Sequence, residues 1–170
     1  MYTSEDILVA REKRIEYQEK LTQKYRMPIL VVRVNYPGLN KDNHFSKGIS
    51  EIMEKTICEA FSCLIHYKKR ITTAEGPLVI ICIDKKPRDI KAMTLNIEDN
   101  HILGRCVDLD VYDENCISIS REEFGLEMRK CYICDDIAHN CVRSKKHSKE
   151  QVEGFIKNRF EEYTEKFNGK

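Results

Sequence analysis

The sequence predicts an α+β fold, the ferredoxin-like βαββαβ sandwich, in which two helices cover one face of an antiparallel sheet. Two observations lead to this prediction. From Pro28 onward, segments rich in β-branched residues alternate with segments whose apolar residues recur every three or four positions. The resulting order is strand, helix, strand, strand, helix, strand, with one helix before it and a Cys-rich helical extension after it.

The N-terminal helix is predicted by its first residues. Thr3 and Asp6 have the spacing of a capping box, in which two side chains satisfy the free N–H groups at a helix start. A charged pattern with sparse apolar positions continues to about Tyr25. We expect a surface helix whose charges form a solvated face.

Residues 28–119 form the predicted α/β core. Asn43 is placed to cap a helix with a broad apolar stripe, and Pro87 stands at the first position of a second helix. The expected helices span about 43–64 and 87–103, and the strands lie at 28–35, 65–73, 78–84 and 106–112, with a short fifth at 116–119. A turn at residues 74–77 joins the middle strands in a hairpin.

The length and charge of the chain limit the possible functions. With 170 residues, the chain is long enough for one well-packed domain, 1–170, whose last part, 120–170, holds the Cys-rich segment and a C-terminal helix. Its 29 Lys and Arg balance 28 Asp and Glu, so no global charge favours nucleic acid or an acidic membrane. The sequence contains no signal-peptide pattern and no apolar run of membrane length, which predicts a cytoplasmic protein.

Asp108 and Asp110 are the candidate catalytic residues. They alternate with Val107, Leu109 and Val111, so both carboxylates leave the same face of a half-buried strand. Two such carboxylates, together with substrate phosphates, suit Mg²⁺. A solvated strand face is the alternative interpretation. A mixed sheet of the nucleotidyltransferase type also holds paired aspartates on a strand, and it is the alternative fold.

The face that carries this pair is expected to be open to a ligand. In a ferredoxin-like sandwich the first and last strands are neighbours, and the helices cover only one face of the sheet. The apolar positions of the first strand, such as Val32, should face the helices. Arg33 and Asn35 are therefore expected to share the open face with the two aspartates.

The Cys-rich segment, residues 129–148, is a candidate metal site. Cys131, Cys134, Cys141 and His147 provide three sulfurs and an imidazole, a ligand set of tetrahedral structural zinc, and His139 is an alternative to His147. The spacing is not that of a standard zinc finger, and reduced thiols packed in a small knot are the other interpretation. The basic run that begins at Arg143 suits either phosphates or a solvated helix start.

Three segments, taken together and in this order, resemble the citrate lyase holo-acyl-carrier-protein synthase family. They are 35–41 (NYPGLNK), 104–111 (GRCVDLDV) and the Cys-rich segment from Cys131 to Ser148. The resemblance spans nearly the whole chain and is looser around Glu75–Leu78. It implies an enzyme of nucleotidyltransferase type that uses 2'-(5''-triphosphoribosyl)-3'-dephospho-CoA. The phosphoribosyl-dephospho-CoA group would be attached to a serine of the acyl-carrier (gamma) subunit of apo-citrate lyase, with release of pyrophosphate.

On the positions that match these motifs, we assign roles as hypotheses. Asp108 and Asp110 would hold Mg²⁺, and one of them would accept the serine proton. The expected substrate-binding residues are Asn35, Lys41, Arg105 and Arg143. Two rival functions are a zinc-containing nucleic-acid-binding module and a non-catalytic assembly subunit. Against the first, strands 29–35 and 78–84 lack the aromatic residues on which RNA-binding sheets stack bases.

Overall fold

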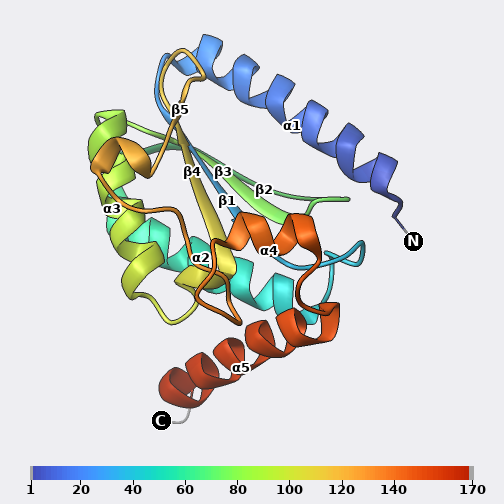
Figure 1. The fold of residues 1–170 in the computed structure, drawn as a ribbon. Helices are drawn as coiled ribbons and strands as arrows, with labels where there is room; N and C mark the ends of the chain where they lie inside the picture. The colour runs from blue at the N-terminus through green and yellow to red at the C-terminus, as the bar shows by residue number, and fades with distance from the viewer. Residues whose placement is uncertain (1, 169–170) are drawn as a thin grey trace.

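The computed structural model describes residues 2–168 and contains a five-stranded sheet with helices on both faces (Figure 1). The strand order is β2-β3-β1-β4-β5. The strands are β1 (Ile29–Val34), β2 (Ile65–Thr73), β3 (Gly76–Ile83), β4 (Val107–Tyr112) and β5 (Ser118–Ile119). Every strand pair formed by residues 2–168 is antiparallel, so the alternative prediction of a mixed sheet is wrong. The predicted pairing of the first and last core strands, β1 and β4, is confirmed.

Five α-helices accompany the sheet in the described part of the chain. They are α1 (Ser4–Tyr25), α2 (His44–Phe61), α3 (Pro87–Asn100), α4 (Ala138–Ser144) and α5 (Lys149–Asn168). The predicted helix starts are confirmed: Thr3 and Asp6 form a capping box, Asn43 caps α2, and Pro87 is in the first turn of α3. No helix among residues 2–168 combines the length and apolar character needed to cross a membrane.

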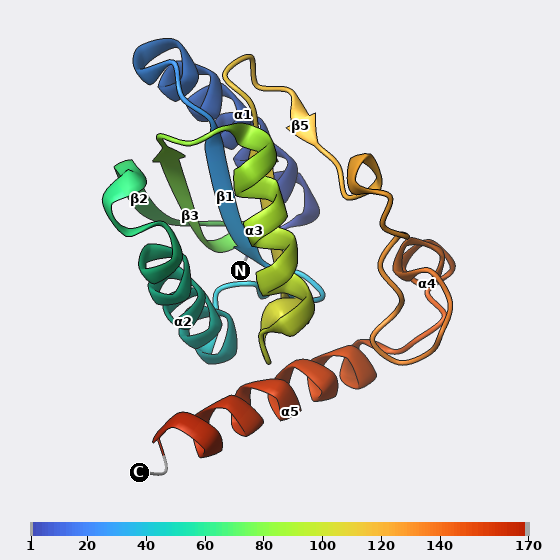
Figure 2. The same cartoon turned by 90° about the vertical axis from the view of Figure 1, so that its left-hand side faces the viewer.

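The two faces of the sheet are covered by different helices: in Figure 2, α3 lies in front of the sheet and α1 lies behind it. Leu30, Val32 and Val34 of β1 pack with the apolar stripes of α2 and α3 in the larger core. On the opposite face, Ile29 and Val31 pack with Leu21 of α1 in a smaller core. Helix α1 crosses this second face (Figure 1).

The expectation of a second face left free for a ligand is therefore wrong over the centre of the sheet. All eight residues of β3 are buried, so this strand is apolar toward both faces. Exposing its α1-facing side would leave a continuous apolar surface in water, which α1 removes by burying it. The expectation of a wholly solvated charged face on α1 is also wrong, because Arg14 and Gln18 are buried against the sheet.

Helix α5 closes the α2 side of the molecule. Ser148 and Gln151 exchange hydrogen bonds at its start, and Ile156 is fully buried in the larger core. A Cβ atom on Gly48 of α2 would lie 2.7 Å from the ring of Phe160, so this glycine permits the close approach of the two helices. Phe167, near the end of α5, is 55% exposed and lies against Tyr163.

Candidate functional site

The paired aspartates lie on the α1-facing side of β4, as their alternation with apolar residues predicts. Val107, Leu109 and Val111 are buried in the larger core, whereas Asp108 and Asp110 are half-buried on the other face. In the β1–β4 register, Arg33 stands opposite Asp108 and Val31 stands opposite Asp110. The pairing of these two strands therefore brings Arg33 beside both carboxylates.

Arg33 is the centre of a charged cluster that we define as Arg33, Glu75, Asp108 and Asp110. Its Nη2 atom lies 2.6 Å from Asp110 Oδ2 and 3.8 Å from Asp108 Oδ2, and its Nη1 atom lies 3.6 Å from Glu75 Oε1. Burial lowers the pKa of Arg33, but the charges of the three carboxylates outweigh burial and raise it overall. The guanidinium thus remains positively charged between them.

Glu75 was not singled out as a site residue from the sequence. It lies in the two-residue hairpin turn between β2 and β3, and its side chain is only 4% exposed. Arg14 Nε donates a 2.8 Å hydrogen bond to it, and Arg11 Nε lies 3.8 Å away. A signal for this contact does exist in the sequence. Arg11, Arg14 and Gln18 recur at three and four positions and form a polar stripe on one face of α1.

The loop after β1 places Lys41 beside the hairpin turn that carries Glu75. Its Nζ atom donates a 2.7 Å hydrogen bond to the carbonyl of Tyr36. Gly76 has a φ of +88°, and a Cβ atom there would lie 2.7 Å from the carbonyl oxygen of Lys41, so the glycine lets this loop touch the hairpin. Burial lowers the pKa of Lys41, and the positive charge of Arg33 lowers it further.

The proton affinity of Asp108 is altered by its position. Burial raises its pKa above the ordinary value, and the negative charge of Asp110 raises it further. Arg33 and Arg129 act in the opposite direction but do not cancel the rise. Asp108 is therefore better suited to accept a proton than an ordinary surface aspartate.

Arg129 connects Asp108 to the Cys-rich segment. Its Nη1 atom donates a 2.9 Å hydrogen bond to the carbonyl of Val107 and lies 3.4 Å from Asp108 Oδ1. Its Nη2 atom forms an ion pair with the buried carboxylate of Glu98, which also accepts a 2.9 Å hydrogen bond from the backbone N–H of Leu109. The segment is thus tied to both the backbone and the side chains of β4.

The other three candidate substrate-binding residues lie at separate positions. Arg105 donates to the carbonyl of Lys130 and lies over the ring of Tyr132. The side chain of Asn35 is exposed just after β1, and its backbone N–H donates to Cys106. Arg143 is exposed on α4. The contacts that assemble the charged cluster join Arg33 to Glu75, Asp108 and Asp110 instead.

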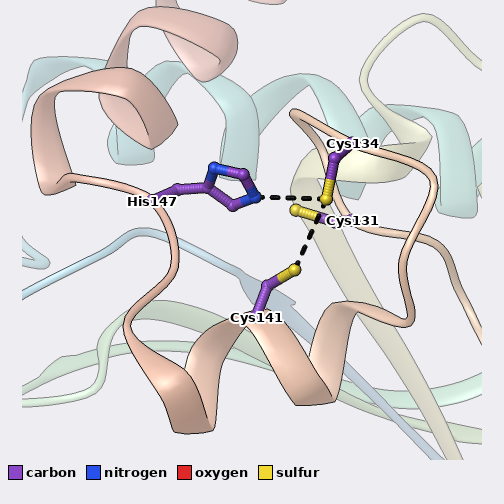
Figure 3. Close-up of side chains that lie close together, drawn as sticks. All are labelled: Cys131, Cys134, Cys141 and His147. Carbon is purple, nitrogen blue, oxygen red and sulfur yellow. Dashed lines mark hydrogen bonds between the residues drawn. The ribbon is translucent and has the colours of Figure 1, made fainter.

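The Cys/His group, defined as Cys131, Cys134, Cys141 and His147, is assembled as the sequence predicts (Figure 3). One ligand atom from each residue lies within 4.8 Å of all the others. His139 is exposed on α4 and is not part of the group, so His147 provides the imidazole. These four residues form a site that can hold a metal ion.

The spacing within the group fits tetrahedral metal coordination. Zinc–sulfur bonds of about 2.3 Å at a tetrahedral angle place two sulfurs about 3.8 Å apart. The Sγ atoms of Cys134 and Cys141 are 3.6 Å apart, and Cys134 Sγ lies 3.3 Å from His147 Nε2. The backbone N–H of Ile133 donates to Cys131 Sγ at 3.4 Å, a contact that stabilises a thiolate.

Comparison with known proteins identifies the family. The family model described as apo-citrate lyase phosphoribosyl-dephospho-CoA transferase matches residues 2–163. A curated protein of that name from Citrobacter koseri is 28% identical over 148 residues, which cover 84% of this chain and 80% of the relative. One from Escherichia coli O7:K1 is 29% identical over 147 residues, which cover 84% and 79%. The chain belongs to the apo-citrate lyase phosphoribosyl-dephospho-CoA transferase family.

Proposed function

We propose that this protein is the enzyme that attaches the phosphoribosyl-dephospho-CoA prosthetic group to the acyl-carrier (gamma) subunit of apo-citrate lyase. The family match and the named relatives support this function. The structural observation that carries it is the pair of aspartates that converge on one guanidinium nitrogen beside a further cation, Lys41. The substrate would be 2'-(5''-triphosphoribosyl)-3'-dephospho-CoA.

The reaction that fits this geometry is phosphoryl-group transfer of the nucleotidyltransferase type. The serine oxygen of the carrier attacks the phosphorus nearest the ribose, and a new phosphorus–oxygen bond forms. The bond from that phosphorus to the rest of the triphosphate breaks, and pyrophosphate leaves with its electron pair. Asp108, whose pKa is raised, accepts the serine proton. Such a reaction depends mainly on alignment of the reactants and on neutralisation of phosphate charge.

We propose that Asp108 and Asp110 hold Mg²⁺. Both carboxylates approach Nη2 of Arg33, so the space between them already accommodates positive charge. Hard oxygen ligands from one or two carboxylates are what Mg²⁺ prefers when substrate phosphates complete its coordination. Bound there, the ion would supply the charge that neutralises the triphosphate.

Lys41 is proposed to contact a phosphate, since it is half-buried beside the charged cluster and its ammonium can approach an anion there. Asn35, Arg105 and Arg143 remain predicted substrate-binding residues. Replacing each of the four with Ala and measuring affinity for the triphosphoribosyl precursor separates them. A weaker affinity supports the assignment of that residue, and an unchanged affinity removes it from the site.

We propose that the Cys/His group binds structural zinc. Three thiolates and one imidazole fill the four positions of tetrahedral zinc and leave none for substrate. The group is also separated in the chain from the aspartates and reaches them through Arg129. Its role would be to fold the segment that carries Arg129 against β4.

Two broader assignments accompany this function. The order β2-β3-β1-β4, with helices α2 and α3 as crossovers on one face, supports the ferredoxin-like classification, to which α1, β5 and the C-terminal segment are additions. We also propose a reducing compartment such as the cytoplasm, in which the eight cysteines, none of them in a disulfide, would stay reduced. We propose that the protein does not bind nucleic acid.

The decisive experiment is to incubate the protein with the apo acyl-carrier subunit, the triphosphoribosyl precursor and Mg²⁺. We expect the mass of the carrier to increase by the mass of one phosphoribosyl-dephospho-CoA group, with release of one pyrophosphate. Carrier that keeps its original mass, under conditions in which a related transferase modifies it, would refute the proposed function. That result would favour a non-catalytic assembly subunit.

A further inference from the structure

A cavity of about 530 Å³ lies between α1 and the sheet and opens beside Asp110. Its lining combines one face of α1 with residues of β1, of β4 and of the loop between β4 and β5. The lining residues are Arg11, Arg14, Ile15, Gln18, Glu19, Arg33, Asp110, Tyr112 and Cys116. Neither sequence motifs nor the family resemblance assigned a role to this space.

Three guanidinium groups line the cavity, and they differ in how many of their N–H donors are already hydrogen-bonded. Arg14 is committed to the protein, because Nε and Nη2 bind Glu75 and Nη1 binds Gln18. Arg11 is 54% exposed and only approaches Glu75, at 3.8 Å. In Arg33, the buried Nε atom has no hydrogen-bond partner among residues 2–168.

Arg11 thus has exposed donors at the cavity, and Arg33, which also lines it, has one buried donor without a partner, whereas the charge of Arg14 is balanced by Glu75. The two carboxylates in the lining, Glu19 and Asp110, do not occupy these donors fully: Glu19 is an exposed residue of α1, and Asp110 binds Nη2 of Arg33. Guanidinium groups present several N–H donors in a plane that matches phosphate oxygens. Their hydrogen bonds to phosphate are stronger where water is partly excluded.

We propose that this cavity binds the two terminal phosphates of the triphosphate, the part that leaves as pyrophosphate. Arg11 and Arg33 donate to the phosphate oxygens, and the phosphorus that reacts lies at the mouth of the cavity, beside Asp108 and Asp110. This inference rests on the proposed function, because it names the subsite that such a substrate requires. It also gives α1 a role, since that helix supplies Arg11.

The test is the binding of inorganic pyrophosphate to the full-length protein by isothermal titration calorimetry, in the presence of Mg²⁺. Loss of one charge-assisted hydrogen-bonding group should weaken binding by about tenfold to a hundredfold in Arg11→Gln. Lys20→Gln is the matched control, because Lys20 is exposed on the same helix and the variant has the same net charge. It should bind pyrophosphate like the parent.

Arg11→Gln is expected to fold normally, since the side chain is half-exposed and Gln favours helices. Parent-like pyrophosphate affinity in this variant, or an equal loss in Lys20→Gln, would overturn the assignment of the cavity. That failure differs from failure of the proposed function. If the parent still modifies the carrier, only the subsite is wrong, whereas a parent that transfers nothing contradicts the function whatever pyrophosphate does.

Discussion

The charged cluster and the Cys/His group are both polar sites, but they are assembled in opposite ways. Arg33, Glu75 and Asp108 come from β1, a hairpin turn and β4, and the pairing of strands brings them together. The Cys/His group comes from one segment of the chain, 131–147, in which α4 is the only helix. The first site is a product of the whole fold, whereas the second, if it binds metal as proposed, uses that metal to hold a short segment in place.

This difference indicates how the charged cluster and the Cys/His group depend on each other. Opposite charges and the sheet core hold the cluster together. The Cys-rich segment has little apolar burial of its own, since Ile133, Ile137 and Val142 are exposed. Its connection to the cluster runs through Arg129 and Asp108. If the Cys/His group binds metal as proposed, loss of that metal should therefore disturb the charged cluster through this contact and leave the sheet intact.

The largest effect is expected from replacing the aspartates of the cluster. Asp108→Asn and Asp110→Asn keep the shape of the side chain but remove the charge that we propose holds Mg²⁺. We expect each to reduce transfer by about a hundredfold or more, because preorganised charge stabilisation is commonly worth that much. The measurement is the rate at which the carrier gains mass. Chelator should abolish parent activity, and Mg²⁺ should restore it in the parent only.

A suitable control for these variants is Asp84→Asn, because Asp84 is exposed after β3 and outside the cluster. It should retain parent activity. Near-normal transfer by Asp108→Asn and Asp110→Asn would contradict the metal-site assignment even though the family membership stands.

The second prediction concerns the metal of the Cys/His group. Protein purified without chelator should contain about one zinc per chain. In Cys141→Ser, which removes a buried ligand, we expect loss of zinc and faster amide hydrogen exchange in residues 129–148, with β1 and β3 still protected. Cys63→Ser, at an exposed thiol outside the group, should change neither property.

Absence of zinc from the parent, together with normal folding and activity of Cys131→Ser and Cys141→Ser, would rule out the zinc proposal. Uniformly faster exchange throughout the sheet of Cys141→Ser would contradict the comparison itself, because the sheet would then depend on the metal.

The third prediction tests the contact between the two regions. Arg129 lowers the pKa of Asp108, so Arg129→Gln should raise that pKa further. If ionised Asp108 accepts the serine proton, the acidic limb of the pH–rate profile should move to higher pH, with the largest loss of activity on the acidic side. A variant that is slower at every pH by the same factor, with no displacement of the acidic limb, would assign Arg129 a purely structural role.

Sequence reasoning predicted the elements that depend on local patterns. The capping box at Thr3, the parity of Asp108 and Asp110, and the four members of the Cys/His group follow from spacing along one segment, and the structure confirms these arrangements. The neighbouring positions of β1 and β4 were also predicted, because the order of elements restricts the topology.

What the sequence did not predict depends on contacts between distant segments. The polar stripe on α1 indicates which side chains are available for contacts, but not that Arg14 will meet Glu75, which lies 61 positions away in the chain. The buried face of β3 indicates that a cover is needed, but not which helix supplies it. Arg105 was grouped with the aspartates because it precedes them in the chain, yet its side chain contacts the Cys-rich segment.

The smallest expected effect is on stability, and it follows from the raised pKa of Asp108. A carboxyl whose pKa is raised on folding contributes most to stability below its ordinary pKa of 3.8, and this contribution is lost as pH rises through the folded-state value. With chelator present, Asp108→Asn should therefore be slightly more stable than the parent at neutral pH. A third of this side chain is exposed, so screening by water limits the gain to less than about 1 kcal/mol, or about 2 °C in Tm.

The difference in stability between Asp108→Asn and the parent should disappear as pH falls toward 3.8, because the parent carboxyl then becomes neutral as well. Thermal unfolding of both proteins across this pH range measures it, and a variant less stable than the parent at neutral pH would show that Arg33 and Arg129 stabilise the charge more than burial and Asp110 disfavour it.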